Sequence, residues 1–119
     1  MPVRSLNSRV LKWPDAAAVD TAARRWAGEL AAREPEITRV GYFGSYARGD
    51  WGVGSDLDLV VLLARSDEPF HRRGAGWDTS SLLVPVDLLI YTKEEWDHHA
   101  GGAFRSELDR EMRWCWERP

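Results

Sequence analysis

Two aspartates separated by one residue stand at the head of an aliphatic run, in Asp56-Leu57-Asp58, which continues into Leu59–Leu63. Because side chains alternate between the faces of a β-strand, both carboxylates are expected on one face. Like charges this close oppose each other's ionisation, and bound divalent cations relieve the repulsion. Mg²⁺ favours one or two carboxylates together with substrate phosphates, so the pair predicts a metal-assisted reaction on a phosphate-bearing substrate.

A third acid, Asp87, interrupts the apolar segment 82–90. A lone charge inside such a run is costly unless it is paired, hydrogen-bonded or bound to a metal. If this segment forms a strand beside the one that carries Asp56 and Asp58, the three carboxylates form a cluster. Such a cluster can hold two metal ions roughly 3.5–4 Å apart, the arrangement used for in-line phosphoryl displacement.

The dipeptide Gly44-Ser45 follows a strand-like segment and opens a predicted helical turn. Free backbone N–H groups at such a turn favour an anionic phosphate, glycine permits close approach, and the Ser45 hydroxyl adds a donor. Arg48 follows within the same turn, and two interpretations of it stay open. Its guanidinium either contacts a phosphate or pairs with a carboxylate.

The elements that must position these residues can be predicted from periodicity. Segment 15–34 is expected to be a helix, with apolar residues on one face, Asp15 as the N-cap and Pro35 ending it. Ile37–Phe43 is expected as a strand. The elements predicted after it are a helical turn at 45–49, a strand at 56–64 buried on both faces, a loop with a short helix at 65–80 and a strand at 81–91.

The C-terminal part is predicted to be helical. Thr92 and Glu95 form a capping box that starts one helix, and Gly101-Gly102 ends it. Segment 103–115 is expected as a final helix, because Phe104, Leu108, Met112 and Cys115 recur at helical spacing. The whole pattern predicts a single α/β or α+β domain, a small sheet with helices packed on it.

Composition limits the classes of function. The 119 residues carry a net charge of −3 and no basic stripe, which disfavours stable binding to bulk nucleic acid. The single cysteine excludes an intramolecular disulfide, the N-terminus lacks a signal-type apolar core, and no run is long enough to span a membrane. A cytoplasmic location is expected. Seven tryptophans either pack in the core or lie on a partner surface.

The motif residues together resemble the minimal nucleotidyltransferases of the DNA polymerase β-like superfamily. Their signature is Gly-Ser, ten residues, Asp-x-Asp, and a later acid on a neighbouring strand, here Asp87. The fuller pattern GSxARGxxxxxSDxDLxV is met by GSYARGDWGVGSDLDLVV, which adds Arg48 and Ser55. The resemblance extends from about Val40 onward, and FRSELDREMRWCW resembles the closing helix of these domains.

This resemblance implies a polymerase β-like fold with a small mixed sheet over residues 1–119. It places an N-terminal helix at about 15–34, the catalytic core at about 37–91 and C-terminal helices at about 93–116. The implied activity moves a nucleoside monophosphate, AMP from ATP or that of another NTP, to an acceptor hydroxyl. Asp56, Asp58 and Asp87 would be catalytic and would hold two Mg²⁺ ions, or Mn²⁺. Gly44, Ser45, Arg48 and Ser55 would bind the nucleotide.

Many such domains are antitoxins paired with a helical HEPN-type ribonuclease, and some adenylylate a tyrosine of that partner. The resemblance therefore implies a HEPN-type partner protein as acceptor. The small size of the chain predicts that the substrate pocket is completed by a dimer mate or by the partner.

Three alternatives stand beside this interpretation. Asp56 and Asp58 could begin a calcium loop, but an EF-hand needs more oxygen ligands than the aliphatic positions after Asp58 provide. The protein could be a non-catalytic antitoxin that masks its partner by binding, which would not require Asp87. It could also modify a small molecule such as an aminoglycoside, although the chain has little room for the extra helical domain that such enzymes carry.

Overall fold

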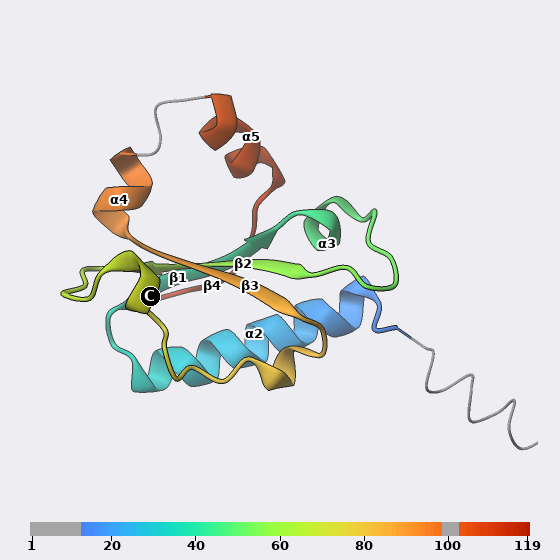
Figure 1. Ribbon diagram of the computed structural model, residues 1–119, viewed down its shortest axis with the longest axis horizontal. Coiled ribbons are helices and arrows are strands. Elements are labelled where there is room, and N and C mark those ends of the chain that lie inside the picture. Colours follow the sequence, from blue (N-terminus) through green and yellow to red (C-terminus); the bar gives the residue numbers. More distant parts are fainter. Residues whose placement is uncertain (1–12, 99–102) are drawn as a thin grey trace, which may run out of the picture.

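The computed structural model describes residues 13–98 and 103–119, in which a four-stranded sheet has helices on both faces (Figure 1). The strands are β1 (Ile37–Phe43), β2 (Leu57–Leu63), β3 (Val86–Thr92) and β4 (Arg113–Glu117). Their order in the sheet is β3-β2-β1-β4. β1 pairs antiparallel with β2 and β4, and β2 pairs parallel with β3. The mixed sheet with packed helices confirms the predicted α+β class.

One long helix covers one face of the sheet and two short helices lie over the other (Figure 1). The long helix is α2 (Ala16–Arg33), and the short ones are α4 (Lys93–His98) and α5 (Ala103–Glu111). A single turn, α3 (Ser45–Arg48), follows β1 as predicted. The N-terminal segment 1–12, assessed above for a signal sequence, lies outside the described residues. Among the described helices, none combines the length and apolar character that crossing a membrane requires.

Strand β2 is the centre of the core because both of its faces are covered. Leu57, Leu59 and Val61 belong to the main cluster with α2, whereas Val60 and Leu62 pack with Trp96 and Met112 on the opposite face. Full burial of each such side chain stabilises the fold by about 1.5–3 kcal/mol. The predicted two-sided burial is confirmed, and it gives the residues at the head of β2 a rigid support.

Both predicted helix starts are confirmed at atomic detail. The Asp15 carboxylate accepts a hydrogen bond from the Ala18 amide at 2.8 Å, as an N-cap does. At the start of α4, the Glu95 amide donates to the Thr92 hydroxyl at 3.1 Å, and the Thr92 amide donates back to the Glu95 carboxylate at 2.8 Å. This reciprocal pair is a capping box. Glu95 also accepts both guanidinium arms of Arg73, which ties the 65–80 loop to α4.

The Glu95 contacts lead to a prediction about stability and pH. Its hydrogen bonds with Arg73 and then the Thr92 amide lower the pKa of Glu95 from 4.5 to about 2. The stabilisation is therefore complete above about pH 4.5 and disappears as pH falls toward about 2. Glu95→Gln keeps the cap acceptor but removes the charge, and it should cost about 1 kcal/mol at neutral pH, because the pair is partly screened.

Denaturant unfolding of wild type and Glu95→Gln at a series of pH values measures this difference. The gap between the two curves should close on acidification. Glu94→Gln, one residue earlier on the exposed side of α4, is the matched control. A difference in the free energy of unfolding that persists unchanged to the lowest pH would refute the stabilising role of the Glu95 charge.

The predicted final helix is wrong at its C-terminal end. α5 stops at Glu111, and the residues RWCWE form β4, hydrogen-bonded to β1. Helical spacing of Leu108, Met112 and Cys115 concealed an aromatic-rich segment that suits a strand. The pairing satisfies the backbone groups on the open edge of β1, which a helix would leave unpaired. The other predicted elements of the C-terminal part that can be compared, α4 and the start of α5, are helical.

The third strand begins later than predicted, at Val86 rather than residue 81. Ser80–Leu82 forms a short 3₁₀ turn, and Leu83 has a positive φ of 76°. Pro85 has no N–H to donate to a ladder, although its carbonyl accepts from the Leu57 amide at 2.9 Å. The apolar character of 82–84 therefore reflects burial of Leu82 and Val84 against the core rather than strand structure.

The seven tryptophans are packing residues in this structure. Trp26 and Trp96 are buried, and the other five are half-buried. Trp96 contacts Trp114 edge-on at 6.0 Å between ring centroids, and Trp51 stacks on Tyr46 at 5.7 Å. All seven pack with the core clusters, as one interpretation of the tryptophan content has it, and a partner surface for the five half-buried rings stays a prediction.

Candidate functional site

The turn after β1 is shaped by Gly44. Its φ of 82° and ψ of −155° lie in a region that is nearly restricted to glycine. The Ala47 and Arg48 amides donate to the Gly44 carbonyl at 3.0 and 2.9 Å and start the α3 turn. A Cβ added at Gly44 would collide with the Asp58 carboxylate. Glycine is therefore required twice, for the backbone conformation and for the close approach of Asp58.

Strands β1 and β2 bring the Gly44-Ser45 turn and the Asp56–Asp58 pair together. Phe43, immediately before the turn, is the register partner of Asp58 across the antiparallel ladder. Asp58 is half-buried, and Asp56 is exposed just before the strand starts. Both aspartates and both turn residues line the same hollow of about 490 Å³. The predicted arrangement of an acid pair opposite a phosphate-type turn is present.

Asp87 lies on the neighbouring strand at the position the sequence predicted. In the parallel β2–β3 ladder, Asp87 is the direct register partner of Asp58. Its side chain is exposed, and it does not line the hollow shared by Asp56 and Asp58. The third acid is thus adjacent in the sheet and accessible from solvent at the rim of the site.

The three acids disfavour one another's ionised forms when no positive charge lies between them. Partial burial raises the pKa of the Asp58 carboxyl above its ordinary value, and the charges of Asp87 and Asp56 raise it further. Arg48 acts in the opposite direction, but more weakly. An added positive charge at this point would stabilise the ionised form of Asp58.

Arg48 makes ion pairs in this structure. Its Nη1 donates to the Glu111 carboxylate at 3.1 Å, and its Nε donates to Asp50 at 3.1 Å. Both contacts raise the pKa of the guanidinium, so it stays charged. Ser55 closes the loop before β2, where its hydroxyl accepts from the Gly52 amide at 2.8 Å. Ser55 is not among the residues that line the hollow, and a nucleotide contact by it stays a prediction.

Three residues that line the hollow were not predicted as site residues: Phe43, next to the turn, and two residues of α5. Leu108 and Glu111 reach it from α5, far along the chain from the motif. The Glu111 carboxylate accepts from the Gly44 amide at 2.8 Å in addition to its contact with Arg48. No spacing rule connects Glu111 to Gly44, because the contact depends on how α5 turns back into β4. Only the fold could reveal it.

Asp56 and Asp58 are the side chains of the hollow that could hold a divalent cation. In the described part of the chain, no three His, Cys, Asp or Glu side chains converge closely enough to hold a metal ion, so Asp87 does not close the predicted three-carboxylate cluster in this structure. Mg²⁺ usually takes one or two carboxylates and completes its shell with water and substrate phosphates. Asp56 and Asp58 would provide the carboxylates of such a shell, and the turn opposite would hold the substrate phosphates. The raised pKa of Asp58 indicates that a cation is favourable beside this carboxyl group.

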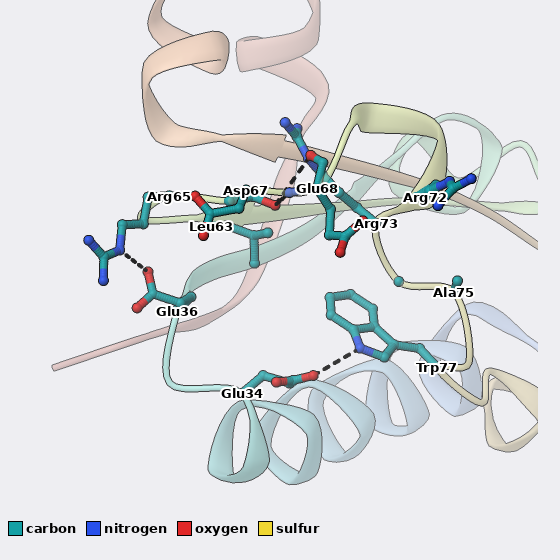
Figure 2. A pocket seen from close by; sticks show the side chains of 12 residues that line it. Glu34, Glu36, Leu63, Arg65, Asp67, Glu68, Arg72, Arg73, Ala75 and Trp77 are labelled. Carbon is teal, nitrogen blue, oxygen red and sulfur yellow. Dashed lines mark hydrogen bonds and ion pairs between the residues drawn. The ribbon is translucent and has the colours of Figure 1, made fainter.

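A larger hollow of about 780 Å³ lies elsewhere, between the C-terminal end of α2, the end of β2 and the 65–77 loop (Figure 2). Among its charged groups, Arg65 lies 3.7 Å from Glu36, Arg73 pairs with Glu95 outside the hollow, and Glu34 accepts from the Trp77 indole at 3.2 Å. Acids and bases are mixed around it, and none of the predicted site residues lines it. Size therefore does not identify the site, and the chemistry points to the smaller hollow.

Comparison with known proteins agrees with this geometry. The family model for the nucleotidyltransferase domain matches residues 23–113. The chain belongs to this nucleotidyltransferase domain family. The match includes the Gly44-Ser45 turn and all three acids. No curated protein sequence matches the chain.

Two solved structures share the fold. One, from Sulfolobus solfataricus, is provisionally assigned as a nucleotidyltransferase; it is 23% identical, with a TM-score of 0.57 over 90% of this chain and 91% of that one. The other is a toxin–antitoxin structure with AMP-PNP, 21% identical, with a TM-score of 0.55 over 80% of this chain and 73% of that one. At these identities the likeness establishes the architecture.

Proposed function

We propose that this protein is a metal-dependent nucleotidyltransferase that moves a nucleoside monophosphate, AMP from ATP, to an acceptor hydroxyl. The observation that carries the proposal is the contact between the Gly44 turn and Asp58, with Asp87 in register beside Asp58. A phosphate-binding turn and metal-type carboxylates thus face each other across one hollow. That is the arrangement that transfer at a phosphorus atom requires.

Each predicted site residue has a distinct role in the proposed reaction. The Gly44 and Ser45 amides and the Ser45 hydroxyl would bind the triphosphate, with Arg48 adding positive charge. Asp56 and Asp58 would hold Mg²⁺, and Asp87, in register beside Asp58, would join a metal only after its side chain turns toward them, since the three do not converge in this structure. Bound Mg²⁺ would neutralise the phosphate charge and orient the α-phosphate. Asp87, which is exposed to solvent beside Asp58 in the sheet, would take the proton of the acceptor hydroxyl.

The acceptor is proposed to be a tyrosine hydroxyl of a small helical partner of HEPN type. Support comes from the shared fold with the toxin–antitoxin structure that contains AMP-PNP, a non-hydrolysable analogue of ATP. The hollow of about 490 Å³, to which eight of the described residues contribute, also leaves room for a second protein to complete the acceptor side. The protein would then neutralise its partner by covalent modification.

Intact-mass spectrometry tests this proposal. The candidate partner is incubated with MgATP and either wild-type protein or Asp56→Ala. We expect one AMP adduct on the partner with wild type and none with Asp56→Ala. If wild type adds no AMP to any acceptor while Asp56→Ala still neutralises the partner, the enzymatic proposal fails and masking by binding replaces it.

A further inference from the structure

Glu111 accepts hydrogen bonds from two of the donors that would bind a nucleotide phosphate. One carboxylate oxygen accepts from the Gly44 amide at 2.8 Å and the other from Arg48 at 3.1 Å. A carboxylate that bridges a turn amide and a guanidinium makes the same charge-assisted hydrogen bonds as a phosphate oxygen pair. Without a ligand, two of the anion-binding groups of the site are therefore already paired with an anion of the chain itself.

The position of Glu111 is fixed by structure on both sides of it. It is the last residue of α5, and the next amide, of Met112, still donates to the Leu108 carbonyl at 2.8 Å. Arg113, the first residue of β4, donates from Nε to the Ala47 carbonyl at 3.1 Å, at the α3 turn itself. The backbone at Glu111 is thus held against the site, while its side chain, 23% exposed, retains an opening to solvent.

The negative charge around the hollow disfavours binding of a second anion while Glu111 keeps its contacts with Gly44 and Arg48. Asp56, Asp58 and Glu111 line it, and Arg48 is the one lining cation among the described residues. A triphosphate that enters while Glu111 stays in place meets three carboxylates, and Glu111 already occupies the Gly44 amide and Arg48. The phosphate and the Glu111 carboxylate cannot both accept from the single Gly44 N–H with good geometry.

We propose that Glu111 is a built-in competitor of the nucleotide, whose carboxylate must leave Gly44 and Arg48 before the triphosphate binds. The inference rests on the proposed function and concerns regulation of that same site. Rotation of one side chain is sufficient for release, because the backbone at Glu111 need not move. Any partner that draws the Glu111 carboxylate away would raise nucleotide affinity, so nucleotide binding would be coupled to partner binding.

Calorimetric titration with MgATP tests the competition without relying on catalysis. Glu111→Ala removes the competing anion, and Glu111→Gln keeps a hydrogen-bond acceptor but removes the charge. Both variants should bind MgATP about tenfold more tightly than wild type, the scale of one charge-assisted hydrogen bond. Glu117→Gln makes the same change on β4, at the far end of the β1–β4 pair, and should bind as wild type does.

A second measurement reports on the contact itself. In ¹⁵N–¹H spectra without nucleotide, the Gly44 amide should shift strongly in Glu111→Ala and stay in place in Glu117→Gln. Thermal unfolding of each variant verifies that it is folded.

The outcomes separate the two proposals. Wild type that binds and transfers the nucleotide, with Glu111 variants that bind equally or more weakly, overturns the competitor role alone. Equal tightening in Glu117→Gln also overturns it, since the effect would then be one of net charge. Absence of MgATP binding by wild type and by every variant overturns the proposed function and this inference together.

Discussion

Asp58→Asn is expected to reduce nucleotidyl transfer by roughly a thousandfold or more, because a bound metal contributes several kcal/mol to the transition state and the amide is a poor ligand for it. Asp58 is the acid that the fold places most centrally. It contacts the Gly44 turn, pairs in register with Phe43 and with Asp87, and lines the hollow. Initial rates of AMP incorporation at saturating MgATP measure the loss.

The same substitution should leave the fold intact and make it slightly more stable at neutral pH. Because burial and the neighbouring acids raise the folded-state pKa of Asp58, its ionisation costs stability as pH rises above the ordinary value for an aspartate. Asparagine carries no charge to repel, so its advantage should vanish at acidic pH, where Asp58 itself is protonated. Asp67→Asn, on the exposed 65–80 loop, is the matched control. An Asp58→Asn protein that unfolds more easily, or that retains activity, would contradict the account.

Gly44→Ala is expected to remove activity and to destabilise the fold by about 1–3 kcal/mol, the usual cost of a backbone conformation that only glycine adopts easily. The new methyl group would also meet the Asp58 carboxylate and force it away from the turn. Denaturant unfolding gives the stability change, and MgATP titration gives the loss of binding.

Gly49→Ala separates the two causes. Gly49 has a φ of 90°, but a Cβ added there meets nothing within 4 Å. Its alanine variant should therefore show backbone strain of about 1–2 kcal/mol with nucleotide binding retained. If Gly44→Ala and Gly49→Ala lose stability and nucleotide binding to the same extent, the close approach of Gly44 and Asp58 does not contribute to nucleotide binding.

Much of the site could be predicted from sequence because its residues are local. Gly44-Ser45 and Asp56-Leu57-Asp58 lie within one short segment, and strand periodicity alone places both carboxylates on one face. Asp87 was accessible to prediction because a charge inside an apolar run requires a partner. The structure places it in register with Asp58. Domain limits beyond the described elements, and the catalytic roles themselves, stay predictions.

The residues that escaped prediction depend on non-local pairing. The helical spacing of Leu108, Met112 and Cys115 predicts a helix where β4 forms, because nothing local reveals the open edge of β1 with which this segment pairs. Glu111 was missed for the same reason. Its contact with Gly44 exists only because α5 ends where β4 begins to pair with β1. Arg48 stayed ambiguous in the sequence, and its ion pair with that same Glu111 is what the structure adds.

The most direct test of nucleotidyl transfer compares ATP labelled on the α-phosphate with ATP labelled on the γ-phosphate. Each is incubated with Mg²⁺, the protein and its acceptor, and the label on the acceptor and in pyrophosphate is counted. We predict α-label on the acceptor, γ-label only in released pyrophosphate, and neither product with Asp58→Asn. Transfer of the γ-label to the acceptor, or α-label transfer that survives Asp58→Asn, would contradict the account.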